Sequence, residues 1–365
     1  MIKVGSDFSG VGAFNQALIR LGVEYKEVFA CDMDKFARET FIHNYGEPEY
    51  YPTNVYDREI PSESLDIYMT SPPCQAFSLA GKRLGKEDKR GILFFNSHEF
   101  IQVNKPRFFI FENVKGLLSD DGGRTFQEWV NMLGGKSVNG VPVLFPYDDS
   151  VPYHLYWQVL NAKNHGVPQN RERVFLIGIR DDADNRFQFP REEHLTKRLK
   201  DVLDDEIDEK YFVTNTKIEY LQRSEGTTFN INANILTQEN PNVSRTIQNG
   251  YWKGGRDNQF IRIKSATSKG YEEATEGDSI NFKNINSETR RGRVGKGVAQ
   301  TIESNNMSVH TIKHGQIRRL TPRECFRLMD FPDTFTWTVS DSQAYKQAGN
   351  SIVVNVLYKI LKNLL

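Results

Sequence analysis

The sequence predicts a doubly wound α/β fold of the Rossmann-like type, with a mostly parallel sheet and a smaller, irregular, β-containing domain. Short apolar runs alternate with amphipathic stretches through the first half of the chain, and turns rich in glycine or proline follow several of the runs. Near residue 181 this alternation gives way to charged and then polar sequence, which indicates a second structural unit.

Each element of the first half has its own pattern. The predicted strands are short apolar runs at Ile2–Gly5, Glu27–Ala30, Leu65–Met69, Phe108–Phe111 and Val174–Ile179. The predicted helices repeat apolar residues at helical spacing and cover residues 14–21, Lys35–Asn44, Phe94–Val103 and Thr125–Leu133. Strands that alternate with helices in this way favour a sheet covered by helices on both faces.

The second half predicts a different kind of structure. Asp181–Glu209 is rich in charge, and the residues that follow, to about 312, are polar with short β-branched runs, which favours short strands in irregular chain. The helix predicted at Ser351–Leu364 is apolar on one face and needs a core to pack against. We therefore expect a first domain at 1–184, a second domain at 185–315, and a C-terminal segment, 316–365, that returns to the first domain.

Composition limits the function classes. Lys plus Arg and Asp plus Glu number 47 each, so any nucleic-acid surface must be local. The three cysteines, Cys31, Cys74 and Cys325, are too sparse for a disulfide framework or a paired-cysteine zinc site, and no metal is expected. The chain has no apolar run of about 18 residues and no signal peptide pattern, so we expect a soluble, cytoplasmic protein. A monomer is the default, because no heptad or repeat suggests assembly.

A glycine turn follows the first strand. In Phe8–Phe14, Gly10 and Gly12 let the backbone approach a ligand at a helix N-terminus, although a plain tight turn explains two glycines equally well. About 20 residues on, Asp32 can bond a ribose hydroxyl and Met33 can pack on an adenine; alternatively Asp32 and Asp34 cap the next helix. Because the phosphate-binding motifs are missing or incomplete, a nucleoside cofactor without phosphates fits better than NAD or ATP.

A proline–cysteine loop follows the third strand. Cys74, in Ser71–Ser78, stands at the carboxyl end of a parallel strand, where such folds place their chemistry. A lone cysteine is often an inert buried side chain, but polar and proline-rich flanks argue against burial here. The glycine-containing, cationic segment Leu79–Leu93 suits closure over a phosphate backbone, and a merely solvated loop would look similar.

Two further groups accompany the cysteine. Glu112 ends the fourth strand and can serve as a general acid, as a base-reading group or as a helix cap. Arg171 and Arg173 point the same way if their segment is extended, so they can hold a base oxygen, anchor phosphates or form a surface ion-pair ladder.

Taken in order, these blocks resemble the bacterial DNA (cytosine-5) methyltransferases over residues 1–180 and 315–365. The matching blocks are Phe8–Phe14, Asp32-Met33, Pro72–Ser78, Glu112-Asn113-Val114, Gln169–Arg173, Arg319–Glu324 and Gln347–Ile352. The resemblance implies an enzyme that transfers the methyl group of S-adenosyl-L-methionine to C5 of a flipped-out cytosine in duplex DNA. It implies that Cys74 attacks C6, that Glu112 bonds N3, and that Arg173, supported by Arg171, holds O2.

The resemblance also implies the binding residues. The expected cofactor contacts are Phe8, Gly10, Gly12, Asp32, Met33, Asn54, Val55, Pro73, Leu93, Phe331, Asn350, Ser351 and Ile352. The candidate DNA contacts are Gln75, Ser78, Lys82, Arg83, Gln169, Arg256, Arg291, Arg293, Lys296 and Thr301. The chain departs from the family pattern at Ser6-Asp7, Ala13, Met33 and Asn54, all on the cofactor side.

The partner implied by the resemblance is double-stranded DNA. The enzyme would be the modification member of a restriction–modification system, beside a separately acting endonuclease, or an orphan or phage methyltransferase. Two alternatives are a related methyltransferase acting on transfer RNA, which the long recognition segment disfavours, and a catalytically silent DNA-binding regulator, which the intact Cys74, Glu112 and Arg173 disfavour.

Overall fold

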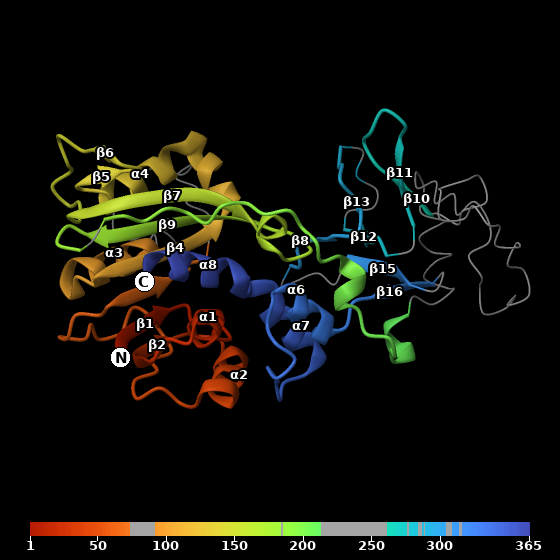
Figure 1. Cartoon of the computed structure of the whole chain (residues 1–365), viewed down its shortest axis with the longest axis horizontal. Coiled ribbons are helices and arrows are strands. Elements are labelled where there is room, and N and C mark those ends of the chain that lie inside the picture. Colours follow the sequence, from red (N-terminus) through yellow and green to blue (C-terminus); the bar gives the residue numbers. More distant parts are fainter. Residues whose placement is uncertain are drawn as a thin grey trace, which may run out of the picture.

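The computed structural model describes residues 1–73, 92–183, 185–212, 261–275, 277–283, 287, 289–303, 309–313 and 316–365, and Figure 1 shows two lobes. In these residues, eight strands form the main sheet of the larger lobe. Their order is β2 (Tyr25–Cys31), β1 (Ile2–Asp7), β3 (Ile67–Thr70), β4 (Phe108–Val114), β9 (Glu172–Arg180), β7 (Tyr153–Asn161), β5 (Ser137–Val138) and β6 (Val141–Pro142).

The sheet is parallel from β2 to β4 and becomes mixed beyond it. β9 runs antiparallel to both β4 and β7. The predicted Rossmann-like α/β class is therefore confirmed, with a mixed rather than uniformly parallel sheet. The four parallel strands end at one edge, and this edge is where their following loops can meet.

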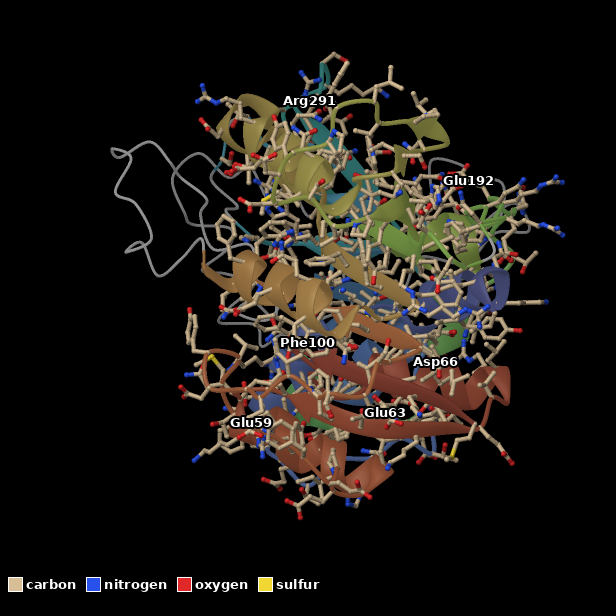
Figure 2. All side chains as sticks on the ribbon, turned by 90° about the vertical axis from the view of Figure 1, so that its left-hand side faces the viewer. Glu59, Glu63, Asp66, Phe100, Glu192 and Arg291 are labelled. Carbon is tan, nitrogen blue, oxygen red and sulfur yellow. The ribbon has the colours of Figure 1, made fainter. Side chains whose placement is uncertain are left out.

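Helices cover both faces of the sheet, because successive strand side chains point to opposite faces. Met69 and Ile110 pack in the core beneath α1 (Ala13–Leu21), α2 (Lys35–Tyr45) and α8 (Val354–Leu364). Tyr68 and Phe109 pack in the opposite core, beneath α3 (Ile92–Asn104) and α4 (Arg124–Leu133). Phe100 of α3 lies between that helix and the sheet (Figure 2).

The C-terminal segment returns to the larger lobe, as the apolar face of its last helix predicts. α8 packs against α1, although the two helices are far apart in sequence (Figure 1). The chain reaches α8 through α6 (Pro322–Leu328) and α7 (Asp341–Asn350). The short 3₁₀ helices are η1 (Lys115–Gly123), η2 (Ala162–His165), η3 (Leu199–Val202) and η4 (Glu209–Tyr211).

The smaller lobe consists of short strands. β10 (Ile261–Lys264) pairs with β11 (Tyr271–Ala274), and an antiparallel sheet has the order β13 (Val294–Gly295), β12 (Ser279–Asn281), β15 (Val309–Lys313) and β16 (Gln316–Arg319). A parallel pair, β8 (Gln169–Asn170) with β14 (Ala299–Gln300), joins the two lobes.

The stretch 185–212, the first part of the second expected domain, shares a core with both lobes. Phe187, Leu199, Val202 and Tyr211 are buried in the core that α1 and α8 share. The same core includes Ala299 and Ile302 of the smaller lobe, and Leu199 N–H donates to Gly297 O at 2.7 Å. This stretch therefore contacts both lobes, and the domain boundary at residue 185 remains a prediction. In the described part of the chain, no helix is both long and apolar enough to cross a membrane.

Candidate active site

A cleft of about 1240 Å³ opens along the carboxyl ends of β1, β2, β3 and β4. Its walls also include residues 346–352 of the C-terminal segment, apart from residue 348, and Lys283, Thr301, Ile302 and Glu303 of the smaller lobe. The volume exceeds that of most small-molecule pockets, so a cofactor and a nucleobase can share it.

Most of the expected cofactor residues line this cleft. They are Phe8, Gly10, Asp32, Met33, Asn54, Val55, Pro73, Leu93, Asn350, Ser351 and Ile352. Two others do not. A side chain at Gly12 would clash with the ring of Tyr45, so that glycine serves the packing of α1 on α2. Phe331 is buried in the core, where it packs against Phe326 and Phe335. These two expectations are corrected.

Of the two aspartates considered as caps of the second helix, Asp34 has that role and Asp32 does not. Asp34 caps α2 by accepting hydrogen bonds from Phe36 and Ala37 N–H. Asp32 instead accepts from the N–H groups of Gly10 and Asp34, each at 2.8 Å, and it lines the cleft. Burial raises the pKa of the Asp32 carboxyl, although these N–H groups oppose the rise.

The cleft fits a nucleoside cofactor. Asp32 offers carboxylate oxygens to ribose hydroxyls, while the buried Val55 and the 86% exposed Met33 offer apolar surface to a base. Gly10, at φ 55°, leaves open space beside the turn because no atom lies within 4 Å of where a Cβ would stand.

Glu112 and Arg173 meet at the other end of the cleft. Arg173 Nε lies 3.0 Å from Glu112 Oε1, and both residues line the cleft. Burial raises the pKa of Glu112, while Arg173 and Arg171 act to lower it. The carboxylate does not cap the next helix, because η1 begins at Lys115 with no side-chain cap. The arrangement suits a Glu112 carboxyl group that keeps its proton beside the fixed positive charge of Arg173.

Arg171 points into the interior rather than forming a surface ion-pair ladder. Its guanidinium donates to the carbonyl oxygens of Ile302 at 2.9 Å, Gly349 at 2.9 Å and Ser351 at 2.8 Å. These carbonyls belong to the smaller lobe and the C-terminal segment. Arg171 thus connects its own segment with the smaller lobe and the C-terminal segment at the cleft. It affects the site by holding these segments in place.

Arg171→Met is therefore expected to lower the free energy of unfolding by about 3 kcal/mol or more, because buried carbonyls lose their donors. Arg291→Met is the matched control. Arg291 is exposed and lies at the edge of the molecule in Figure 2, so its loss should cost about 0.5 kcal/mol or less. Denaturant unfolding of both variants checks this, and equal stabilities would contradict the bridging role.

Cys74 lies outside the described residues, but the chain that leads to it is placed. Asn113 Nδ2 donates to Pro72 O at 3.0 Å, and Pro73 lines the cleft. The segment carrying Cys74 therefore starts beside Glu112. The other two cysteines, Cys31 and Cys325, are buried, and burial raises both thiol pKa values, that of Cys31 to about 12. Neither is suited to form a thiolate.

The candidate DNA contacts fall into three groups. Gln75, Ser78, Lys82, Arg83 and Arg256 lie outside the described residues. Arg291, Lys296 and Thr301 have surface or cleft positions; Lys296 pairs with Asp278 at 2.7 Å, and Thr301 lines the cleft.

Two candidate DNA contacts are instead buried. Gln169 donates to Leu328 O at 2.7 Å, and Arg293 donates to Lys283 O at 3.0 Å, both with 0% exposure. A long polar side chain satisfied by carbonyls inside the protein is not available to DNA. These two expectations are corrected to structural roles.

The sequence analysis missed several residues of the cleft. Lys283 and Glu303 form an ion pair that lines it from the smaller lobe, and Tyr56 and Lys346 also line it. No local pattern marks Lys283 or Glu303, because tertiary folding brings them there. Tyr56 directly follows Asn54-Val55 in sequence, and this adjacency is a usable signal.

A Rossmann-like sheet whose carboxyl edge carries a nucleoside-type pocket beside an acid–arginine pair defines a nucleoside-dependent group-transfer enzyme. The model of the C-5 cytosine-specific DNA methylase family matches residues 2–365. The chain belongs to this family: it is a DNA (cytosine-5) methyltransferase that uses S-adenosyl-L-methionine as methyl donor.

Individual relatives support this assignment along the whole chain. The type II methyltransferase M.HhaI of Haemophilus parahaemolyticus is 32% identical, with 98% of this chain and 92% of the relative covered. The orphan methyltransferase M.SPRI of Bacillus phage SPR is 31% identical, with 100% and 97% covered. The Dnmt2 methyltransferase of S. pombe has a similar fold, with a TM-score of 0.62, 20% identity, and 100% and 98% of the two chains covered.

Proposed function

We propose that this enzyme methylates a cytosine flipped out of duplex DNA through a transient covalent bond from Cys74 to C6. The observation that carries the proposal is the Glu112–Arg173 pair, 3.0 Å apart in the cleft, with Pro72 tethered beside it by Asn113. The pair presents a carboxyl group and a guanidinium next to one another, just as N3 and O2 of cytosine are neighbours on one edge of the ring.

The chemistry assigns a task to each side chain. C5 of cytosine is a poor nucleophile, and addition of the Cys74 thiolate to C6 converts the ring into an enamine that can attack through C5. Glu112 holds a proton at N3 as negative charge develops on the ring, and Arg173 donates to O2. After C5 has gained its methyl group, loss of the C5 proton and departure of Cys74 restore the aromatic ring.

The cofactor residues lie along the same cleft. Asp32 would bond the ribose, Val55 and Met33 would enclose the adenine, and the backbone around Gly10 would leave room for the methionine part. When bound there, S-adenosyl-L-methionine supplies an electrophilic methyl group. The pocket and the Glu112–Arg173 pair share one cleft, so the cofactor and the base can meet inside it.

Sequence recognition is proposed for the smaller lobe. A base within a duplex must leave the stack to reach the Glu112–Arg173 pair inside the cleft. The lobe places Lys283 and Thr301 on the cleft and Arg291 on the surface, where lysine, threonine and arginine can contact phosphates or base edges. We assign recognition to the second expected domain, residues 185–315.

The relatives suggest a biological setting. Several are type II methyltransferases, and others are orphan methyltransferases of Bacillus phages. We propose that this enzyme acts on double-stranded DNA in the cytoplasm as a monomer, either as a modification enzyme beside a separate endonuclease or as an orphan enzyme.

Methyl transfer to matched duplex DNA and RNA tests the proposal. The purified protein should transfer labelled methyl groups from S-adenosyl-L-methionine to DNA and not to RNA of the same sequence. Methylation-sensitive sequencing of DNA from cells expressing it should then show C5-methylcytosine within one short sequence. Transfer to RNA in preference to DNA, or methylation at nitrogen, would refute the proposal.

A further inference from the structure

A buried ion pair lies beneath the cofactor end of the cleft. Arg58 Nε lies 2.9 Å from Asp7 Oδ1, and the two side chains are 2% and 0% exposed. Tyr68 donates its hydroxyl to the other carboxylate oxygen, Asp7 Oδ2, at 2.5 Å. Moving two charges out of water costs free energy, so a buried ion pair does not by itself show that the pair stabilises the fold. The presence of this pair therefore needs another explanation.

The position of Arg58 gives that reason. The segment 53–56, whose residues line the cleft, contains no helix or strand, and Arg58 lies two positions beyond its end. The Arg58 guanidinium lies over the Phe100 ring, 4.6 Å from its centroid, and within 3.5 Å of Asn96 O. Asp7 ends β1 immediately before Phe8, and it lines the cleft together with Phe8 and Gly10 of the glycine turn.

We propose that the Asp7–Arg58 pair, held by Tyr68, is a positioning device that fixes the segment with Asn54 and Val55 against the glycine turn and so sets cofactor affinity. The pair joins the two walls between which the nucleoside must fit. If the segment spent a tenth of its time in the binding conformation, the apparent dissociation constant would rise about tenfold. This inference rests on the proposed cofactor role of the cleft.

A purely structural role makes a different prediction. Loss of a core interaction lowers overall stability and leaves the affinity of the remaining folded protein unchanged. Tyr153 provides the matched control, because it is buried in the same core as Tyr68 and donates its hydroxyl to Pro106 O at 2.6 Å. Tyr153 does not line the cleft in the described part of the chain.

The experiment is a calorimetric titration of the folded protein with S-adenosylhomocysteine, the cofactor without its transferable methyl group. Relative to the parent, Asp7→Asn should bind about tenfold more weakly and Tyr68→Phe about threefold more weakly, while Tyr153→Phe should bind within about twofold. In turnover assays, the KM for S-adenosyl-L-methionine should rise in the first two variants, with kcat at saturating cofactor and the KM for DNA unchanged.

Every outcome decides the question. If Asp7→Asn does not fold, the comparison of Tyr68→Phe with Tyr153→Phe carries the test. Equal affinity of the parent and Tyr68→Phe, or equal weakening in the two tyrosine variants, overturns the positioning role while the proposed function stands. Failure of the parent to bind S-adenosylhomocysteine overturns the cofactor assignment of the cleft, and the inference falls with it.

Discussion

Cys74→Ser is expected to reduce methyl transfer to DNA by about 10⁴-fold or more, while DNA binding remains. A serine hydroxyl is almost un-ionised near neutral pH and has no neighbour in the proposed mechanism that removes its proton. The C5 atom would then keep its low nucleophilicity. Initial rates of labelled methyl transfer and a DNA gel-shift titration measure the two properties separately.

The control for this variant is Cys325→Ala. Cys325 is buried in α6, so its loss should reduce stability while turnover persists below the unfolding temperature. DNA with 5-fluorocytosine at the target adds a direct readout, because fluorine cannot leave C5 as a proton does. The parent should become covalently attached to this DNA and Cys74→Ser should not. A Cys74→Ser enzyme as fast as the parent would refute the covalent mechanism.

The sequence predicts the fold well where local patterns and tertiary packing agree. Apolar runs identify β3, β4 and β9 because their central residues are buried on both faces and so read as continuous apolar sequence. β1 and β2 are identified from shorter apolar runs, because their first residues are only partly buried. β7, Tyr153–Asn161, was missed. Its polar positions, His154 and Gln158, interrupt the run, and its antiparallel pairing with β9 has no local sequence signal.

The candidate site could likewise be predicted only in part from the sequence. The structure places Asp32, Glu112 and Arg173 on one cleft, because each lies at the end of a strand of the sheet and the topology brings these strand ends together. Their roles in the reaction stay predictions. Arg293 and Gln169 could not be separated from DNA-contacting residues, since burial depends on distant segments. The Asp7–Arg58 pair joins residues 51 positions apart, and the sequence around neither residue indicates the pairing.

Glu112→Gln is expected to lower kcat by about 10²–10⁴-fold, because an amide keeps the shape of the carboxyl group but cannot deliver a proton to N3. The affinities for DNA and for the cofactor should change little, because residue 112 lies beside Arg173 in the parent and in the variant. Single-turnover methyl transfer at saturating DNA measures this effect. Glu172→Gln is the neighbouring control: Glu172 pairs with Lys115 at 2.9 Å on the surface, and its loss should change kcat by about twofold or less.

The pH profile distinguishes proton transfer from simple positioning. Burial raises the pKa of Glu112, so the carboxyl group keeps its proton to higher pH than an exposed glutamic acid. The proton-dependent part of kcat is then fully present below this raised pKa and is lost as the pH rises through it. In Glu112→Gln that descending limb should vanish, and the ascending limb due to ionisation of the nucleophile should remain. An identical descending limb in the variant would show that another group holds the proton at N3.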